Sequence, residues 1–221
     1  EGWYMENGTA TVTIDSIEDL GNLTKKVFTD WTGAANTTSP SVTVTMNSSK
    51  TLEAQWKTQY YLSVNAQGGV VDTGSQWVDA GSTVTVTAST TCNEVTSRSR
   101  SVFTQWIGDV TSTSPSVTTK MDSPKTLTAA WKTQYYLTVK SDYGDPKGEA
   151  WYDAGSTATF SVTTPVGVVV QQVFAGWRGN STAKTNIASI TMDTPATVIA
   201  DWKTDYTQLL AIAVAVVILV G

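Results

Sequence analysis

The side chains that most often carry out catalysis or bind metals are scarce in this sequence. Its 221 residues contain no histidine and a single cysteine. Histidine is the commonest general base and metal ligand, and one cysteine can form neither an intrachain disulfide nor a thiolate metal cluster. Two segments are acidic, at residues 15–19 and 142–149, but neither has the ligand spacing of a calcium loop. We therefore predict no catalytic residue, no cofactor, no metal site and no enzymatic activity.

Two kinds of side chain remain that could be covalently modified. Cys92 stands in a polar stretch, so we expect a free surface thiol, with an interchain disulfide as the alternative. Five asparagines begin an Asn-x-Ser/Thr sequence, all in segments with turn or loop composition, where glycans can be attached. These candidate glycosylation sites are Asn7, Asn22, Asn36, Asn47 and Asn180. We expect three or more of them to be occupied.

The charge balance excludes one class of partner. Charged residues make up 15% of the chain and the formal net charge is −5, with no cluster of Lys or Arg. A nucleic-acid-binding protein needs a basic patch or stripe, so we expect no nucleic acid as partner. Thr and Ser fill the polar positions instead, and the β-branched Thr is typical of strands.

The sequence repeats itself. The segment that begins at Lys57, Lys-Thr-Gln-Tyr-Tyr-Leu, recurs at Lys132, and a shorter form begins at Lys203. The repeats predict three β-modules, at residues 1–56, 57–131 and 132–203, followed by a hydrophobic segment at 204–221. The spacing between the first and second Trp varies from copy to copy, which predicts one surface loop within each module, around residues 15–26, 89–101 and 163–172.

All nine tryptophans follow this repeat, three in each copy. A Phe precedes the second Trp of each copy by three residues, and a Met lies between the second and the third. Aromatic side chains at fixed places in such small modules favour a core role over a sugar-binding platform. We therefore assign to the core Trp3, Trp31, Trp56, Trp77, Trp106, Trp131, Trp151, Trp177 and Trp202.

Apolar residues alternate with polar ones before the third Trp of each copy, which is the period of a half-buried strand. A turn sequence such as Asn47-Ser-Ser-Lys50 separates two such strands, so each module is expected to end in a β-hairpin. Asn7 stands where the other copies have Gly81 and Gly155, which predicts a positive φ at all three. The fold class is therefore all-β: three tandem modules of about 70 residues in an extended rod.

Four motifs of this repeat resemble a known family. They are the Tyr-Tyr-Leu-Thr-Val start, the Trp-Tyr-Asp-Ala-Gly-Ser turn, the Phe-x-x-Trp-x-Gly step and the Met-Asp-x-Pro-Lys-Thr-Leu-Thr-Ala-x-Trp close. Over residues 1–203 the chain resembles divergent internalin-B-type B-repeats, and the Lys-Thr-Gln-Tyr-Tyr variant is similar to those of archaeal surface proteins. The first copy lacks its opening strand. The resemblance implies a surface stalk or adhesin and transfers no catalytic residue.

The end of the chain is apolar. No charge occurs from Leu209 to Gly221, and as a helix this stretch would measure about 20 Å, less than a bilayer core. We expect it to be helical and part of a C-terminal membrane anchor, which places the chain outside the cell, at its surface. The alternative is a strand at residues 205–221 that completes the open sheet of another chain and so builds a filament.

These observations favour a structural function. We expect a cell-surface stalk or surface-layer component that spaces an N-terminal region from the membrane, with the membrane and other surface-layer or filament subunits as partners. The alternative is an adhesin, a glycan- or protein-binding module that uses its variable loops or the exposed rings of Tyr61 and Tyr136.

Overall fold

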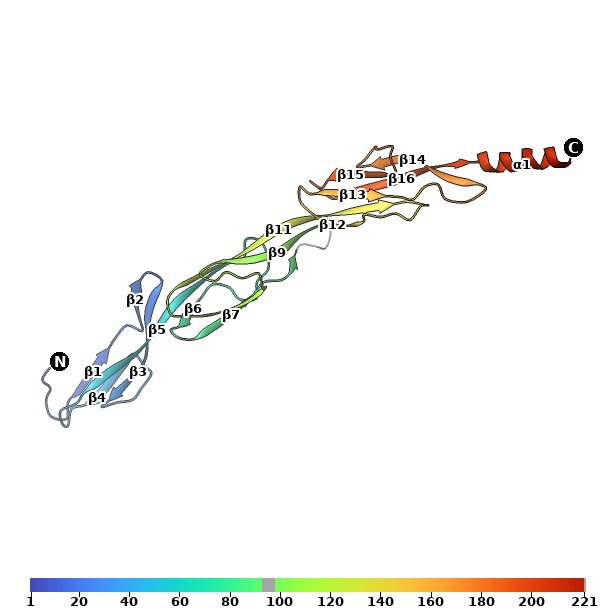
Figure 1. The fold of residues 1–221 in the computed structure, drawn as a ribbon. Helices are drawn as coiled ribbons and strands as arrows, with labels where there is room; N and C mark the ends of the chain where they lie inside the picture. The colour runs from blue at the N-terminus through green and yellow to red at the C-terminus, as the bar shows by residue number, and fades with distance from the viewer. Residues whose placement is uncertain (93–97, 221) are drawn as a thin grey trace. The chain divides into compact units, whose positions relative to one another are not determined.

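The computed structural model describes residues 1–92 and 98–220, which form sixteen strands and one helix (Figure 1). Tertiary contacts divide the chain into two compact units. The first holds residues 1–89 and 104–130. The second holds the described residues of 90–103 and those from Trp131 onward. Two strands, β9 (Ser99–Gly108) and β11 (Lys125–Lys140), contribute residues to both units.

The first unit is made of short strands arranged along one long strand, β5. Its other complete strands are β1 (Thr9–Thr13), β2 (Ile17–Gly21), β3 (Thr24–Gly33), β4 (Ser41–Thr45), β6 (Gln76–Asp79), β7 (Thr83–Thr87) and β10 (Ser116–Lys120). Strand β5 (Leu52–Asn65) pairs antiparallel with β3 and β6, and its end is parallel to the start of β11. Strands β1 and β4 form a separate sheet, as do β7 and β10.

The second unit repeats this plan around β11. Its other strands are β8 (Thr91–Cys92), β12 (Ala150–Asp153), β13 (Thr157–Ser161), β14 (Gln171–Gly179), β15 (Ile187–Thr191) and β16 (Ala196–Asp205). Strand β11 pairs antiparallel with β12 and parallel with β16, and β16 pairs antiparallel with β14. Strands β13 and β15 form a separate sheet. Figure 1 shows β13 and β15 beside β14 and β16.

The expectation that each module ends in a β-hairpin is wrong. Strand β4 pairs with β1, whereas β5 pairs with β3, so the turn at residues 47–50 carries the chain from one sheet to another. The pairs β7–β10 and β13–β15 show the same change of partner. Alternation correctly indicates that one face of each strand is buried. It does not distinguish a neighbour in the same sheet from one across the core, because both arrangements bury the same face.

The second Trp of each copy lies in the core. Trp31, Trp106 and Trp177 are all buried. Met121 and Met192, which follow Trp106 and Trp177 in their copies of the repeat, are buried as well. In the second unit Trp177 belongs to a cluster with Phe160, which meets it edge to face at a centroid distance of 4.8 Å. The half-buried tryptophans are Trp56, Trp77, Trp131, Trp151 and Trp202.

The assignment of Trp3 to the core is wrong. Its side chain is 104% exposed, and residues 1–5 belong to no strand. The equivalent residues Trp77 and Trp151 lie on β6 and β12, which pair with β5 and β11. Among the described residues, no strand pairs with residues 1–5.

The expected module boundaries at residues 57 and 132 remain a prediction. Strands β5 and β11 run across them without interruption, so each strand ends one copy of the repeat and opens the next. The boundaries of the two compact units therefore differ from the boundaries of the sequence copies.

The C-terminal segment is helical over Thr207–Val220 (α1), and Gly221 lies outside the described residues. The expectation of a helix is confirmed, and the donated strand at residues 205–221 is wrong. The Asp205 carboxylate accepts a hydrogen bond from the Thr207 N–H (2.8 Å), which caps the first turn, and the alanines that follow favour helix. Among the described residues, no helix has the length and apolar character needed to cross a membrane.

Candidate functional site

The described residues hold no group of three His, Cys, Asp or Glu side chains that could bind a metal ion. The most distinctive side-chain arrangement is instead a cluster of two aromatic rings and one cation, which occurs once in each unit. We call these two clusters the aromatic junctions: Tyr61, Trp77 and Lys25 in the first unit, and Tyr136, Trp151 and Arg100 in the second.

In the first junction, Tyr61 of β5 and Trp77 of β6 are directly paired across the two strands. Their ring centroids lie 5.2 Å apart at an interplanar angle of 64°. Lys25 of β3 reaches over the indole, with its Nζ 4.4 Å from the ring centroid. Strand β3 holds Lys25 there because it pairs with the opposite edge of β5, where Lys25 faces Gln59.

The second junction has the same geometry. Tyr136 of β11 pairs with Trp151 of β12, at a centroid distance of 5.2 Å and an angle of 65°. The Arg100 guanidinium lies 4.4 Å from the indole centroid, and its Nε donates to Gln134 Oε1 (2.8 Å). A cation over an indole face is attracted by the quadrupole of the ring, and Arg and Lys both satisfy this requirement.

A carboxylate completes the polar edge of each junction. Asp79 accepts hydrogen bonds from Gln59 Nε2 (2.7 Å) and Lys57 Nζ (3.0 Å). Asp153 accepts the same bonds from Gln134 and Lys132, at 2.7 and 2.8 Å. These donors favour the ionised carboxylate, so the pKa values of Asp79 and Asp153 are lowered, by Gln59 foremost at Asp79 and by Lys132 foremost at Asp153.

A turn of constant geometry follows each junction. Gly81 and Gly155 have positive φ, and their N–H groups donate to the carbonyls of Met121 (2.7 Å) and Met192 (2.9 Å). In the first copy Asn7 has φ 62° and donates to Met46 O at 2.9 Å. The expectation of positive φ at all three positions is confirmed. Gly and Asn adopt this conformation at lower cost than most residues do.

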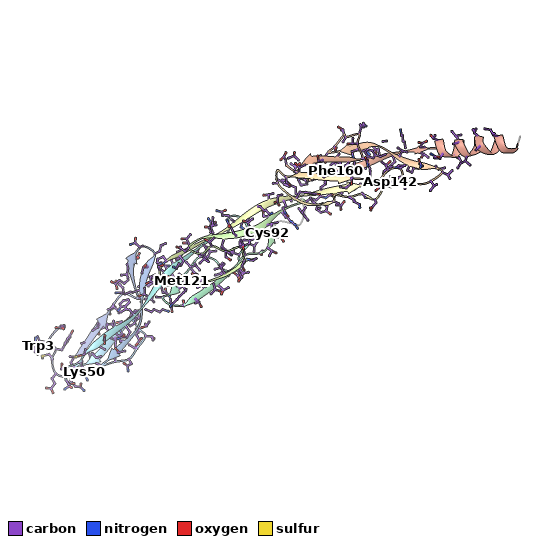
Figure 2. The ribbon with its side chains drawn as sticks, viewed as in Figure 1. Trp3, Lys50, Cys92, Met121, Asp142 and Phe160 are labelled. Carbon is purple, nitrogen blue, oxygen red and sulfur yellow. The ribbon has the colours of Figure 1, made fainter. Side chains whose placement is uncertain are left out.

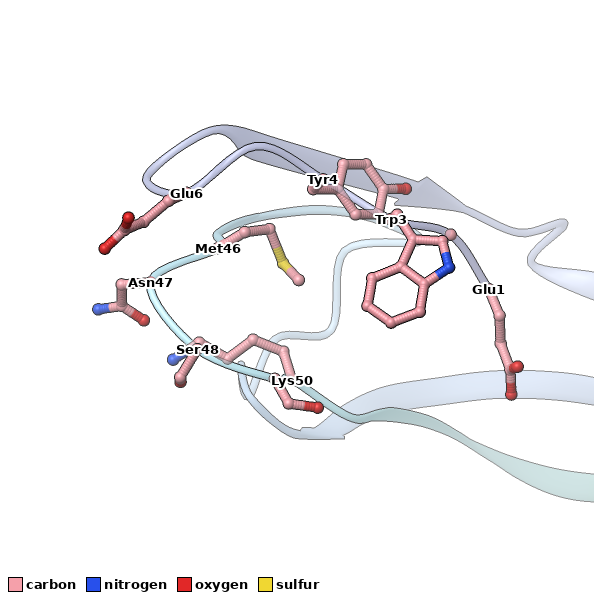
Figure 3. Close-up of a pocket in the computed structure, with 10 residues that line it drawn as sticks. Glu1, Trp3, Tyr4, Glu6, Met46, Asn47, Ser48 and Lys50 are labelled. Atoms are coloured by element: carbon pink, nitrogen blue, oxygen red, sulfur yellow. The ribbon is translucent and has the colours of Figure 1, made fainter.

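Trp3 stands at the equivalent place in the first copy but lacks the rest of the junction. It lies at the same end of the first unit as Lys50 (Figure 2). Figure 3 shows Trp3 and Tyr4 lining a hollow with Met46 and Lys50, among other residues. The first copy therefore has the turn of a junction without a partner strand or cation among the described residues.

The five candidate glycosylation sites all have exposed side chains. Asn7 and Asn22 lie in turns with positive φ, and Asn47 lies on the rim of the hollow beside Trp3. Asn180 has a structural role as well, because its Oδ1 accepts a hydrogen bond from the Thr197 N–H (2.9 Å). Glycosylation of these residues stays a prediction.

The expectation of a surface thiol at Cys92 is wrong. The thiol is free, but it is buried rather than at the surface. Residue 92 pairs with Ser101 in the short β8–β9 ladder, which turns its side chain away from solvent. The polar neighbours in sequence gave no sign of this, because a strand of two residues is too short to show alternation.

Sequence reasoning missed both junction cations. Lys25 and Arg100 fall in segments that were expected to be surface loops, whereas residues 24–25 and 99–100 belong to β3 and β9. The available signal was a basic residue in each of the two insertions that precede a Tyr-Tyr segment. The rings of Tyr61 and Tyr136 pack on Trp77 and Trp151 and are half-buried, which leaves less of their surface for a ligand.

The fold and junctions define a small all-β repeat in which one strand is shared by consecutive copies. Residues 60–134 match the family model of the divergent InlB B-repeat domain. This part of the chain is therefore a divergent InlB B-repeat, a type of repeat that indicates a surface-associated repeat protein. No curated protein and no solved structure is similar enough to the chain to count as a match.

Proposed function

We propose that the chain is a non-enzymatic spacer in an extracellular surface protein, built from three tandem copies of the repeat. The observation that carries this proposal is the shared strand: β5 runs from Leu52 to Asn65 through the expected boundary at residue 57. A connection made of paired strand has no free hinge, since β3 pairs with it through Tyr60 and β6 pairs with it from Gln59 onward. The junction of Lys25, Tyr61 and Trp77 adds side-chain contacts at the same point.

A spacer of this kind holds its two ends apart, so its elongation in solution is the property to measure. We expect small-angle X-ray scattering of the full chain to give the profile of an extended rod, independent of concentration. A matched variant carries Gly-Ser-Gly-Ser after Lys57, which interrupts β5 while leaving each core intact. It should scatter as a more flexible particle with a broader range of end-to-end distances. A compact profile for the native chain would contradict the spacer.

We propose further that helix α1 attaches the spacer to a lipid bilayer. Leu209, Leu210, Ile212, Val214 and Ile218 all have exposed side chains. Residues 207–220 carry no charge, whereas a helix that lies flat on a membrane surface needs a charged or polar face. A fully apolar helix of this kind favours insertion into hydrocarbon over contact with water.

Vesicle flotation tests this attachment. The full chain should float with phosphatidylcholine vesicles, and a chain that ends at Asp205 should stay in the aqueous fraction. Neutral vesicles are chosen because the expected attraction is apolar and does not depend on lipid charge. Recovery of both chains in the aqueous fraction would exclude the attachment and leave the spacer proposal standing.

A further inference from the structure

One exposed loop of the third copy is apolar. Val168, Val169 and Val170 follow one another between the bridged residues Val166 and Gln172, and their side chains are 83%, 37% and 43% exposed. Tight loops are normally built from Gly, Pro, Asn, Asp and Ser, and consecutive exposed apolar residues mark a contact surface. We call residues 166–170 the valine loop.

The valine loop is held at its base by hydrogen bonds. Val166 and Gln172 exchange backbone bonds, N–H to carbonyl in both directions, at 2.9 and 2.8 Å. The Gln171 side chain donates to Gly167 O at 3.4 Å. These bonds fix both ends of the loop, so the three valines form a short apolar tip in front of β14.

Strand pairing places this tip beside the start of helix α1. Gln171 of β14 lies opposite Asp205 of β16. The next residues beyond this pair are Val170 on one chain segment and Tyr206 on the other, and α1 begins at Thr207. The valine loop and the first turn of the apolar helix therefore lie at the same end of the β14–β16 pair.

The lack of charge in this loop is confined to the copy that precedes α1. Residues 163–172 contain no charged side chain. The corresponding insertions of the first and second copies, residues 15–26 and 89–101, each contain both acidic and basic residues. Three insertions at the same place in the repeat thus differ in the one property that decides whether a loop can enter an apolar medium.

Two exposed tyrosines lie close behind the valine loop. Tyr206 precedes α1 directly and is 53% exposed. Tyr143 is exposed too, and its ring meets Trp202 of β16 edge to face, at a centroid distance of 5.7 Å. Tyrosine has an apolar ring and a polar tip, which suits the boundary between lipid and water.

We propose that the valine loop is a second membrane contact, in which Val168, Val169 and Val170 enter the boundary between headgroups and acyl chains of the bilayer that holds α1. The inference rests on the proposed attachment through α1. The loop goes no deeper than this boundary, because its unpaired backbone groups need water or headgroups as partners. With both contacts made, β14 and β16 are held at the membrane surface and cannot pivot on the helix alone.

A depth-sensitive label tests the contact. Val169→Cys in the full chain with Cys92→Ser carries nitrobenzoxadiazole, and phosphatidylcholine vesicles carry a nitroxide on the acyl chain close to the headgroup. We expect emission to fall by about twofold or more, and a nitroxide at the far end of the acyl chain to quench less. Leu20→Cys is the matched control, since it labels an exposed apolar residue in the insertion of the first copy and should not be quenched.

The same experiment works without Cys92→Ser if that variant does not fold, because the native thiol is buried and is labelled slowly. Flotation of the labelled chains separates the outcomes. Flotation without quenching at position 169, or with equal quenching at position 20, would overturn the valine loop and leave α1 as the attachment. A chain that neither floats nor is quenched would overturn both proposals.

Substitutions on either side of the label test the valines themselves. Val168→Ser with Val170→Ser should reduce quenching at position 169 to about half or less. Ile17→Ser with Leu23→Ser removes two exposed apolar side chains from the first copy and should leave it unchanged. Quenching that survives the loss of both valines would overturn their role. An emission shift that depends on protein concentration without lipid would assign the loop to a contact between copies of the chain and overturn the membrane contact.

Discussion

The Lys25 ammonium lies 4.4 Å from the centroid of the Trp77 indole, although the two residues are 52 positions apart in sequence (77 − 25 = 52). The contact joins a residue of one repeat copy to a residue near the beginning of the next. Arg100 and Trp151 are related in the same way, at the same distance. Each contact lies within one of the two compact units.

The Lys25–Trp77 contact predicts a measurable coupling. We expect a double-mutant cycle of Lys25→Ala and Trp77→Leu, followed by urea unfolding, to give a coupling free energy of about 0.5–1 kcal/mol, because both groups are only partly shielded from water. The control is Lys26→Ala with Trp77→Leu, since Lys26 pairs with Glu18 instead, at 3.5 Å. Equal coupling at positions 25 and 26 would assign the effect to general charge rather than to the ring contact.

Trp106 is predicted to be the most costly tryptophan to remove from the first unit. Its side chain is fully buried and its Nε1 donates to Pro115 O at 2.9 Å. Trp106→Ala should lower the free energy of unfolding by roughly 3–5 kcal/mol, measured by chemical denaturation. Trp3→Ala removes an exposed indole and should change it by less than about 0.5 kcal/mol. Similar losses for both variants would contradict the placement of these two side chains.

Gly108 is predicted to tolerate no side chain. Its φ is +117°, and a Cβ at this position would lie 2.3 Å from the Thr126 carbonyl oxygen. Gly108→Ala should therefore destabilise the fold by more than about 2 kcal/mol, since the backbone carbonyl has to move. Gly74→Ala is the matched control because a Cβ there meets open space and φ is not in the left-handed region. Thermal unfolding of the two variants gives the comparison.

The pH dependence of stability follows from carboxylates that are better stabilised in the folded chain than in the unfolded one. Hydrogen bonds lower the pKa of Asp72, Asp79 and Asp153 below the ordinary value of 3.8. A lowered folded pKa stabilises the fold above the unfolded pKa, and this stability is lost as pH falls through the folded values. We expect melting temperatures to be constant from pH 7 to about 5 and to fall below pH 4. Asp79→Asn with Asp153→Asn should flatten that decline.

Cys92 is predicted to react slowly in the folded chain. Its thiol is buried, and only the thiolate of an accessible cysteine reacts rapidly with a disulfide reagent. Titration with 5,5′-dithiobis(2-nitrobenzoate) should give slow release of colour in buffer and rapid release in 6 M guanidinium, by about 100-fold or more. The covalent dimer expected from an exposed thiol should also be absent. Rapid reaction in buffer would place Cys92 at the surface.

Much of the architecture could be predicted from local patterns. Alternating residues around Trp56 and Trp131 predicted the strands, and the shared position of Asn7, Gly81 and Gly155 predicted their positive φ. Both features depend on short-range sterics, which a sequence shows directly. Pairing partners could not be predicted in this way, since the turn after Met46 leads to a different sheet rather than back along the same one.

The sequence alone determined the all-β class, the repeat and the scarcity of catalytic side chains, because composition and periodicity express them at every position. Tertiary structure alone decided that Trp3 is exposed, that Cys92 is buried and that Lys25 and Arg100 cover the rings of Trp77 and Trp151. The two cation–ring contacts join residues about 50 positions apart along the chain, so strand pairing rather than local preference sets the distance between the partners. A solvent-facing Lys and a Lys over an indole have the same local sequence signal, so only the fold separates them.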